Sequence, residues 1–146
     1  MVRRSRSPAA TSLKRRRALL LSCCLLLAAC SSPPLVLEAT GVARDLTPTP
    51  GQEVRVSGSG NVIKVVGNSG PVRVEGTDNS VRLTGSAPAL QVDGKGNSLR
   101  CDQPPTRVTL RGSGHRLLVH LPPGSTRPPL DVQGRDQAVQ FLSPTP

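Results

Sequence analysis

Apolar and polar residues alternate through two short runs in "VRVSGSGNVIKVVGNSG", residues 54–70, and each run ends at a glycine-rich turn. Alternation of this kind is typical of a β-strand with one buried face. β-Branched valine dominates the apolar positions, and strands favour such residues. The stretch therefore predicts two short strands joined by a turn.

The same pattern recurs at a fixed interval. The glycine that ends the first run is repeated every eighteen residues, and a fifth copy follows a four-residue insertion around "PPGSTRPP". These turn glycines are Gly58, Gly76, Gly94, Gly112 and Gly134. Three positions after them come Asn61, Asn79, Asn97, His115 and Gln137. Each repeat thus predicts a strand, a glycine turn, a second strand and a looser turn.

Two all-β architectures fit this unit. One is a short β-solenoid of about five eighteen-residue coils, and the alternative is an antiparallel β-meander or sandwich of hairpins. The constant interval favours the solenoid, because equivalent positions must stack about 4.8 Å apart. The asparagine column favours it too, since stacked amides form a hydrogen-bonded ladder. We therefore expect residues 54–142 to form a β-solenoid, with Cys101 as a small buried apolar residue.

The N-terminal part has a different pattern. Seven basic residues lie within residues 3–17. An apolar run, residues 18–29, follows them and leads into Cys30 in "LAAC". This run of about twelve residues has the length of a signal-peptide core and is too short to span a bilayer. "Leu27-Ala28-Ala29-Cys30" resembles the lipobox of bacterial lipoproteins. The resemblance implies that residues 1–29 are a signal peptide and that lipid on Cys30 holds the protein on a membrane. The alternative is a plain secretory signal with a chance cysteine.

Prolines at both ends of residues 30–53 predict an extended tether. Within it, "LVLEATGVARDL" is either a short capping element or linker. Residues 143–146 predict a frayed tail. Ser31 follows the cysteine where an aspartate retains lipoproteins at the inner membrane of enterobacteria, so we expect placement at the outer membrane or cell surface.

The formal charge of +10 comes mostly from the expected signal peptide, residues 1–29. Seven of the nineteen basic residues precede Cys30, which leaves twelve against nine acids, or about +3. With one Phe and no Tyr or Trp in the chain, we expect no nucleic-acid partner. Only Cys101 is left as a free thiol, so neither a disulfide framework nor a cysteine metal site is expected. The sequence implies no cofactor.

One candidate binding feature lies just behind the turn. Lys64, Arg82 and Arg100 share one outward phase, so a solenoid would stack them into a basic stripe. Such a stripe suits an anionic glycan, lipid or protein partner. The alternative is a solvated strand face in which basic residues discourage edge pairing.

Catalysis requires converging groups, and one pair qualifies. Glu75 and Asp93 would be outward neighbours one coil apart, and β-helix scaffolds do host carbohydrate-active hydrolases and lyases. No further catalytic residue joins them. We therefore expect a non-catalytic cell-envelope lipoprotein with a structural or binding role, and keep such an enzyme as the alternative.

The repeats "VRVSGSGNVIKV", "VRVEGTDNSVRL", "LQVDGKGNSLRC" and "VTLRGSGHRLLV" resemble a bacterial domain of unknown function, family number three thousand and sixty. Its members carry V-x-V-x-G-x-x-N-x-V-x-V repeats and are typically exported, often as lipoproteins. The resemblance covers residues 54–142. It implies export and a repeat fold, and it brings no catalytic residues.

Overall fold

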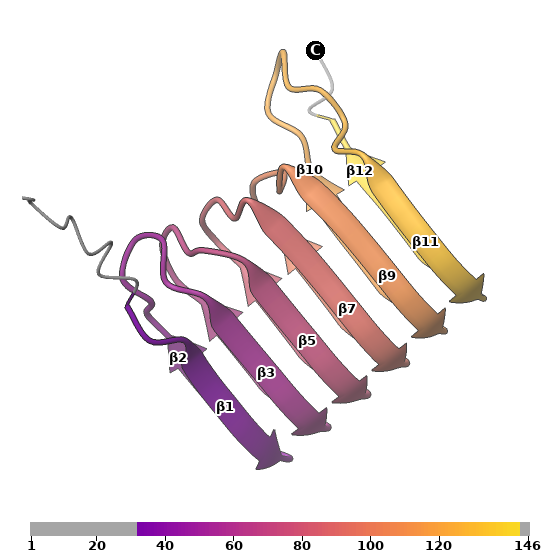
Figure 1. The fold of residues 1–146 in the computed structure, drawn as a ribbon. Coiled ribbons are helices and arrows are strands. Elements are labelled where there is room, and N and C mark those ends of the chain that lie inside the picture. Colours follow the sequence, from indigo (N-terminus) through magenta and orange to yellow (C-terminus); the bar gives the residue numbers. More distant parts are fainter. Residues whose placement is uncertain (1–31, 144–146) are drawn as a thin grey trace, which may run out of the picture.

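The computed structural model describes residues 32–143. Within that part, the chain forms a β-solenoid of six coils with no helix. The proposed signal peptide, Cys30 and residues 144–146 lie outside the described residues. Each coil contributes one strand to each of two six-stranded sheets (Figure 1). We call them the odd sheet and the even sheet after the strand numbers.

The odd sheet contains, in spatial order, β1 (Leu35–Thr40), β3 (Val54–Ser59), β5 (Val72–Thr77), β7 (Ala89–Lys95), β9 (Arg107–Ser113) and β11 (Leu130–Arg135). The even sheet contains, in the same direction, β2 (Ala43–Leu46), β4 (Val62–Val65), β6 (Ser80–Leu83), β8 (Ser98–Cys101), β10 (Arg116–His120) and β12 (Ala138–Leu142). Every strand pairing within residues 32–143 is parallel. A meander would require antiparallel pairs, so the solenoid prediction is confirmed.

The first coil corrects the predicted tether of residues 30–53. Strands β1 and β2 pair in register with β3 and β4, so residues 35–46 form a coil, which brings the number to six rather than five. The sequence hides this coil because Ala39 stands where the other coils have glycine and Val42 where they have asparagine or its substitutes. The proline-rich residues 47–53 connect the first coil to the second.

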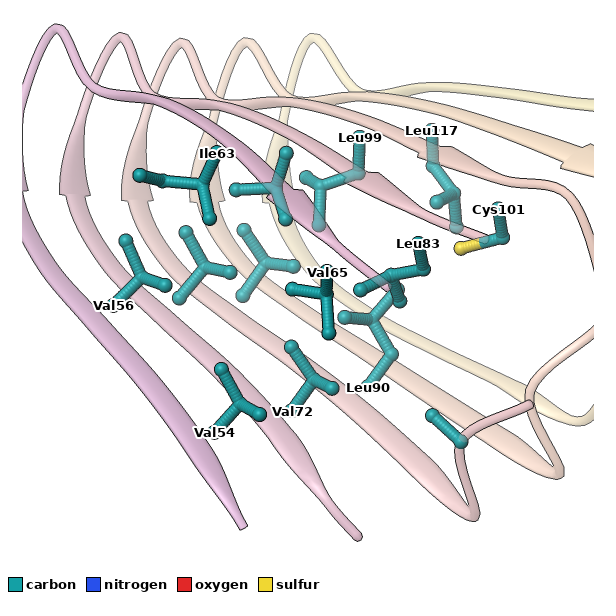
Figure 2. Close-up of a cluster of buried hydrophobic side chains, with 14 of the residues drawn as sticks. Val54, Val56, Ile63, Val65, Val72, Leu83, Leu90, Leu99, Cys101 and Leu117 are labelled. Atoms are coloured by element: carbon teal, nitrogen blue, oxygen red, sulfur yellow. The ribbon is translucent and has the colours of Figure 1, made fainter. Parts of the chain in front are cut away.

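The core is a narrow file of apolar side chains between the two sheets. Valines and leucines from both sheets point into the shared interior, as Figure 2 shows for Val56 and Ile63. The four inward positions of the second coil, Val54, Val56, Ile63 and Val65, are at most 1% exposed. Cys101 lies in the same file, and burial raises the pKa of its thiol to about 12. Alternation of apolar residues therefore fills one continuous core.

The glycine column lets neighbouring coils approach. A Cβ atom added at Gly76 would lie 1.9 Å from the carbonyl oxygen of Gly58, and the residue has a φ of +118°. The same conflict recurs along the column, with 2.0 Å between a Cβ at Gly94 and the oxygen of Gly76. Glycine is needed here because any side chain would collide with the backbone of the preceding coil.

The asparagine column forms a buried amide ladder. Oδ1 of Asn79 accepts hydrogen bonds from the backbone N–H of Asn61, at 3.1 Å, and from its Nδ2, at 3.0 Å. Oδ1 of Asn97 accepts the equivalent pair from Asn79, at 3.0 and 3.2 Å. The second Nδ2 hydrogen of Asn79 goes to the carbonyl of Gly58. The ladder thus satisfies polar groups that the glycine turn would otherwise bury unpaired.

The last two members of the column depart from this geometry. His115 accepts only the backbone N–H of Asn97, at its Nδ1 atom, while its Nε2 lies 2.8 Å from the carbonyl oxygen of Arg111. Gln137 donates from Nε2 to the carbonyls of Gly112 and Gln133, and its Oε1 is buried without a partner. The ladder therefore weakens toward the C-terminal end.

Candidate ligand-binding groove on the even sheet

The outer face of the even sheet carries the predicted basic stripe. Strand pairing sets Lys64 beside Arg82 and Arg82 beside Arg100. The same column begins with Asp45 and continues after Arg100 with Leu118 and Gln140. Parallel register therefore brings the three cations into one line, about 4.8 Å apart.

A second outward column provides a floor of mostly small residues beside the stripe. It consists of Ala43, Val62, Ser80, Ser98, Arg116 and Ala138. Short side chains next to long ones leave a groove of about 980 Å³, which runs across all six coils. Sequence reasoning missed this column, although it has the same eighteen-residue phase, two positions before the stripe. It also missed Arg44 and Arg116, which line the groove.

The charge of the groove is positive but partly balanced. Asp102, just after β8, accepts from Arg82, with Nη2 to Oδ2 at 2.8 Å, and lies 3.4 Å from Nε of Arg100. Within residues 32–143, Lys64 has no ion pair. Four basic residues at outward positions line the groove, Lys64, Arg82, Arg100 and Arg116, and two acids, Asp45 and Asp102, lie in or beside it, which leaves two net positive charges.

The two arginines of the stripe remain accessible to a ligand. Their side chains are 51% exposed for Arg82 and 57% exposed for Arg100, despite the contact with Asp102. Exposed ion pairs hold their side chains weakly. An anion in the groove could therefore replace or extend these contacts without breaking a buried network.

The odd sheet presents a different outer face. Two of its arginines are paired with nearby acids, Arg55 with Glu53 at 2.7 Å and Arg73 with Glu75. The hydrogen bond from Arg55 lowers the pKa of Glu53 below its ordinary value. Arg111 and Asp93 lie side by side on the same face, so acids and bases are mixed here and do not form a line of one sign.

The two carboxylates of the enzyme alternative do lie side by side. Glu75 and Asp93 are register neighbours on β5 and β7. Each is held by its own strand, however: Glu75 by Arg73, and Asp93 by the side-chain amide of Gln91 at 2.7 Å. Both carboxylates are thus engaged by side chains of their own strands, which suits a polar sheet face more than an acid–base pair.

Among residues 32–143, no cluster of three or more His, Cys, Asp or Glu side chains is placed to hold a metal ion. Residues 32–143 contain no helix that is long and apolar enough to cross a membrane.

Comparisons with known proteins gave no match. No family model, no well-characterised protein and no solved structure is significantly similar to this chain. The resemblance of the repeats to the domain of unknown function therefore stays a prediction, and the function must be argued from the groove itself.

Proposed function

We propose that the protein is an exported, non-catalytic lipoprotein, anchored through Cys30, whose even-sheet groove binds an extended acidic glycan. The observation that carries the proposal is the line of Lys64, Arg82 and Arg100 beside a floor of small residues. The anchor rests on the lipobox resemblance, and the ligand class rests on the groove.

The spacing of the cations favours a linear ligand. Like charges at neighbouring positions of adjacent strands destabilise a sheet, and an anion alongside them offsets that cost. Asp102 offsets part of it for Arg82 and Arg100. Six strands spaced about 4.8 Å apart extend the groove over about 24 Å. A chain of repeated carboxylates can contact successive coils, whereas one compact anion would meet only part of the line.

The shape of the groove favours a glycan. Its walls are long polar side chains, while its floor offers serine hydroxyls and small apolar groups. Hydroxyl-rich sugar rings can use both kinds of surface. Exposed charge pairs contribute only about 0.2–1 kcal/mol each, so we expect several weak contacts whose sum is salt-sensitive.

The first coil also bears on the anchor. Leu35, the first residue of β1, follows Cys30 by five residues, which reach at most about 18 Å when fully extended. A lipid on Cys30 would therefore keep the solenoid close to the membrane surface. Glycans of the envelope lie within reach of such a position.

The test is binding of a fluorescent polygalacturonate, followed by anisotropy, to the full chain in non-ionic detergent. We compare the wild type with Lys64→Ala/Arg82→Ala/Arg100→Ala. The matched control, Arg55→Ala/Arg73→Ala/Arg111→Ala, removes the same charge from the odd sheet. Loss of three exposed contacts should weaken binding about tenfold in the groove variant and leave the control within about twofold of wild type.

Three results would contradict the proposal. Equal weakening in both variants would indicate attraction to net charge alone. If the wild type does not bind the glycan, an acidic glycan is not the ligand. Binding of anionic phospholipid vesicles but not of the glycan, with the same dependence on Lys64, Arg82 and Arg100, would assign the groove to lipid phosphates instead.

A further inference from the structure

The two ends of the solenoid are built differently. At the C-terminal end, the inward residues Leu130 and Val132 of β11 are 39% and 43% exposed, whereas Val108 and Leu110, one coil earlier, are fully buried. On β12, Val139 and Phe141 are only partly buried. Among the strands of residues 32–143, none pairs with the outer side of β11 (Figure 1). The last described coil therefore leaves both apolar side chains and strand edges open.

The N-terminal end, in contrast, is closed to a further coil of the same kind. A coil stacks on the preceding one only with glycine in the column, because a Cβ there meets the preceding carbonyl oxygen at 1.7 to 2.0 Å. The first coil has Ala39 at this position. Ala39 is not among the residues with positive φ, and its side chain packs against the core. The first coil therefore lacks the glycine conformation with which every later coil stacks on the one before it.

Two more residues of the first coil act in the same direction. Arg44 occupies the column of the buried Ile63, so an inward position carries a charge at the N-terminal edge. Val42 stands in the asparagine column and offers no side-chain acceptor for the backbone N–H of Gln137 in another copy. Inward charges are a known means of blocking edge pairing. The first coil therefore works as a cap.

The open C-terminal end is complementary to itself. If β11 pairs antiparallel with β11 of a second copy about a two-fold axis at Val132, Leu130 lies opposite Gly134, where no side chain competes for space. Asp131 then faces Gln133, and these two already form a hydrogen bond within one chain, at 3.2 Å. No like charges meet along the strand. Such pairing also covers Val132, which is 43% exposed in one copy.

We propose that two copies of this protein associate through their C-terminal ends, with β11 of one copy hydrogen-bonded antiparallel to β11 of the other. The interface is isologous, so it closes on itself, and the capped N-terminal ends stop further growth. The assembly is a dimer of twelve coils. This inference is independent of the groove, which lies on the outer face of the even sheet.

The test is sedimentation equilibrium of the full chain in density-matched non-ionic detergent. We expect the wild type to be a dimer and Val132→Arg to be a monomer, because the variant places two cations at the two-fold axis. The matched control is Val36→Arg, the same change at an exposed valine on the outer face of β1; it should remain a dimer. Thermal unfolding of both variants verifies that the fold persists.

A cross-link locates the interface. In oxidised Val132→Cys, a disulfide should link two copies because the two residues meet at the axis, with Cα atoms about 5.5 Å apart as in a hydrogen-bonded antiparallel pair, a separation that a disulfide can span. Oxidised wild type controls for the native cysteines. A monomeric wild type, a dimer that Val132→Arg leaves intact, or a dimer without the Val132→Cys cross-link would each overturn the proposal. The proposal would also be overturned if the wild type were a monomer whose C-terminal end binds a different protein.

Discussion

Asn97 donates its backbone N–H to Nδ1 of His115 at 3.3 Å, so the buried amide ladder changes its chemistry at the fifth coil. In the two steps before it, one asparagine oxygen accepts both the backbone and the side-chain donor of its neighbour. The imidazole accepts only one, and Nε2 of the same ring must carry the hydrogen that goes to Arg111. The ladder thus loses one of its two hydrogen bonds where the histidine enters it.

Replacing His115 with asparagine should restore the missing step. We expect His115→Asn to raise the free energy of unfolding by about 1 kcal/mol, the usual net contribution of one hydrogen bond. Urea unfolding followed by circular dichroism measures it. The reciprocal variant Asn97→His moves the break one coil earlier and should destabilise. A less stable His115→Asn would mean that packing of the ring outweighs the hydrogen bond.

Gly76→Ala tests the glycine column. Its Cβ would meet the oxygen of Gly58 at 1.9 Å, so we expect a loss of more than about 3 kcal/mol or failure to fold. Gly124→Ala is the matched control, since Gly124 also has positive φ, +77°, but nothing within 4 Å. Its cost should be about 1 kcal/mol, that of the backbone conformation alone. Similar losses in both, in thermal unfolding, would argue against the steric role.

Cys101 gives the stability a dependence on alkaline pH. Burial raises the pKa of its thiol from 9.0 to about 12, so only the unfolded chain loses the proton between these values. The thiol's contribution to stability is therefore full below pH 9 and falls as pH rises toward 12. We expect the unfolding free energy of the wild type to fall relative to that of Cys101→Val as pH rises through this window. A difference that stays constant with pH would show that the folded core does not disfavour the thiolate.

The cap of the first coil can be removed by design. The combined change Ala39→Gly, Val42→Asn and Arg44→Val gives the first coil the residues of a middle coil. We expect head-to-tail stacking to compete in this variant with the β11–β11 pairing, so that chains longer than two copies form as concentration rises and are visible by light scattering. Arg44→Val alone is the control, since it leaves Ala39 in place. Unchanged size in the combined variant would contradict the capping role.

Lipidation of Cys30 is tested apart from the fold. In a bacterium that processes lipoproteins, the mature protein should begin at Cys30, carry acyl groups by mass spectrometry and sediment with membranes. Cys30→Ser should lose the acyl groups and the membrane fraction while its circular dichroism spectrum stays that of the wild type. A wild type cleaved elsewhere and free of lipid would support the plain secretory signal instead.

The sequence predicts the solenoid because its signals are local and periodic. Asn79 lies three positions after Gly76 in one coil, and the equivalents of both residues in neighbouring coils lie eighteen residues away, so the period alone predicts their columns. The first coil escapes the same reasoning because its role as an end requires departures from the repeat. Ala39 and Arg44 are informative only once the strands are paired in register.

The candidate site divides in the same way. The line of Lys64, Arg82 and Arg100 follows from the period, since equivalent positions of a parallel stack must align. The contact with Asp102 does not follow from the period, because Asp102 lies just after its strand and accepts hydrogen bonds from Arg82 of the preceding coil. The groove depends on the contrast in side-chain length between two columns, which becomes visible only when both are placed on one face.

The glycine column also determines how this molecule can change its size. Each coil must present a glycine to the one before it, while the loop of residues 122–129 shows that extra residues are accommodated between strands. Gene duplication of one middle repeat would therefore add a whole coil, lengthen the groove by about 4.8 Å and extend the basic line by one residue. The number of repeats in the gene would then set the length of polymer that the groove can contact.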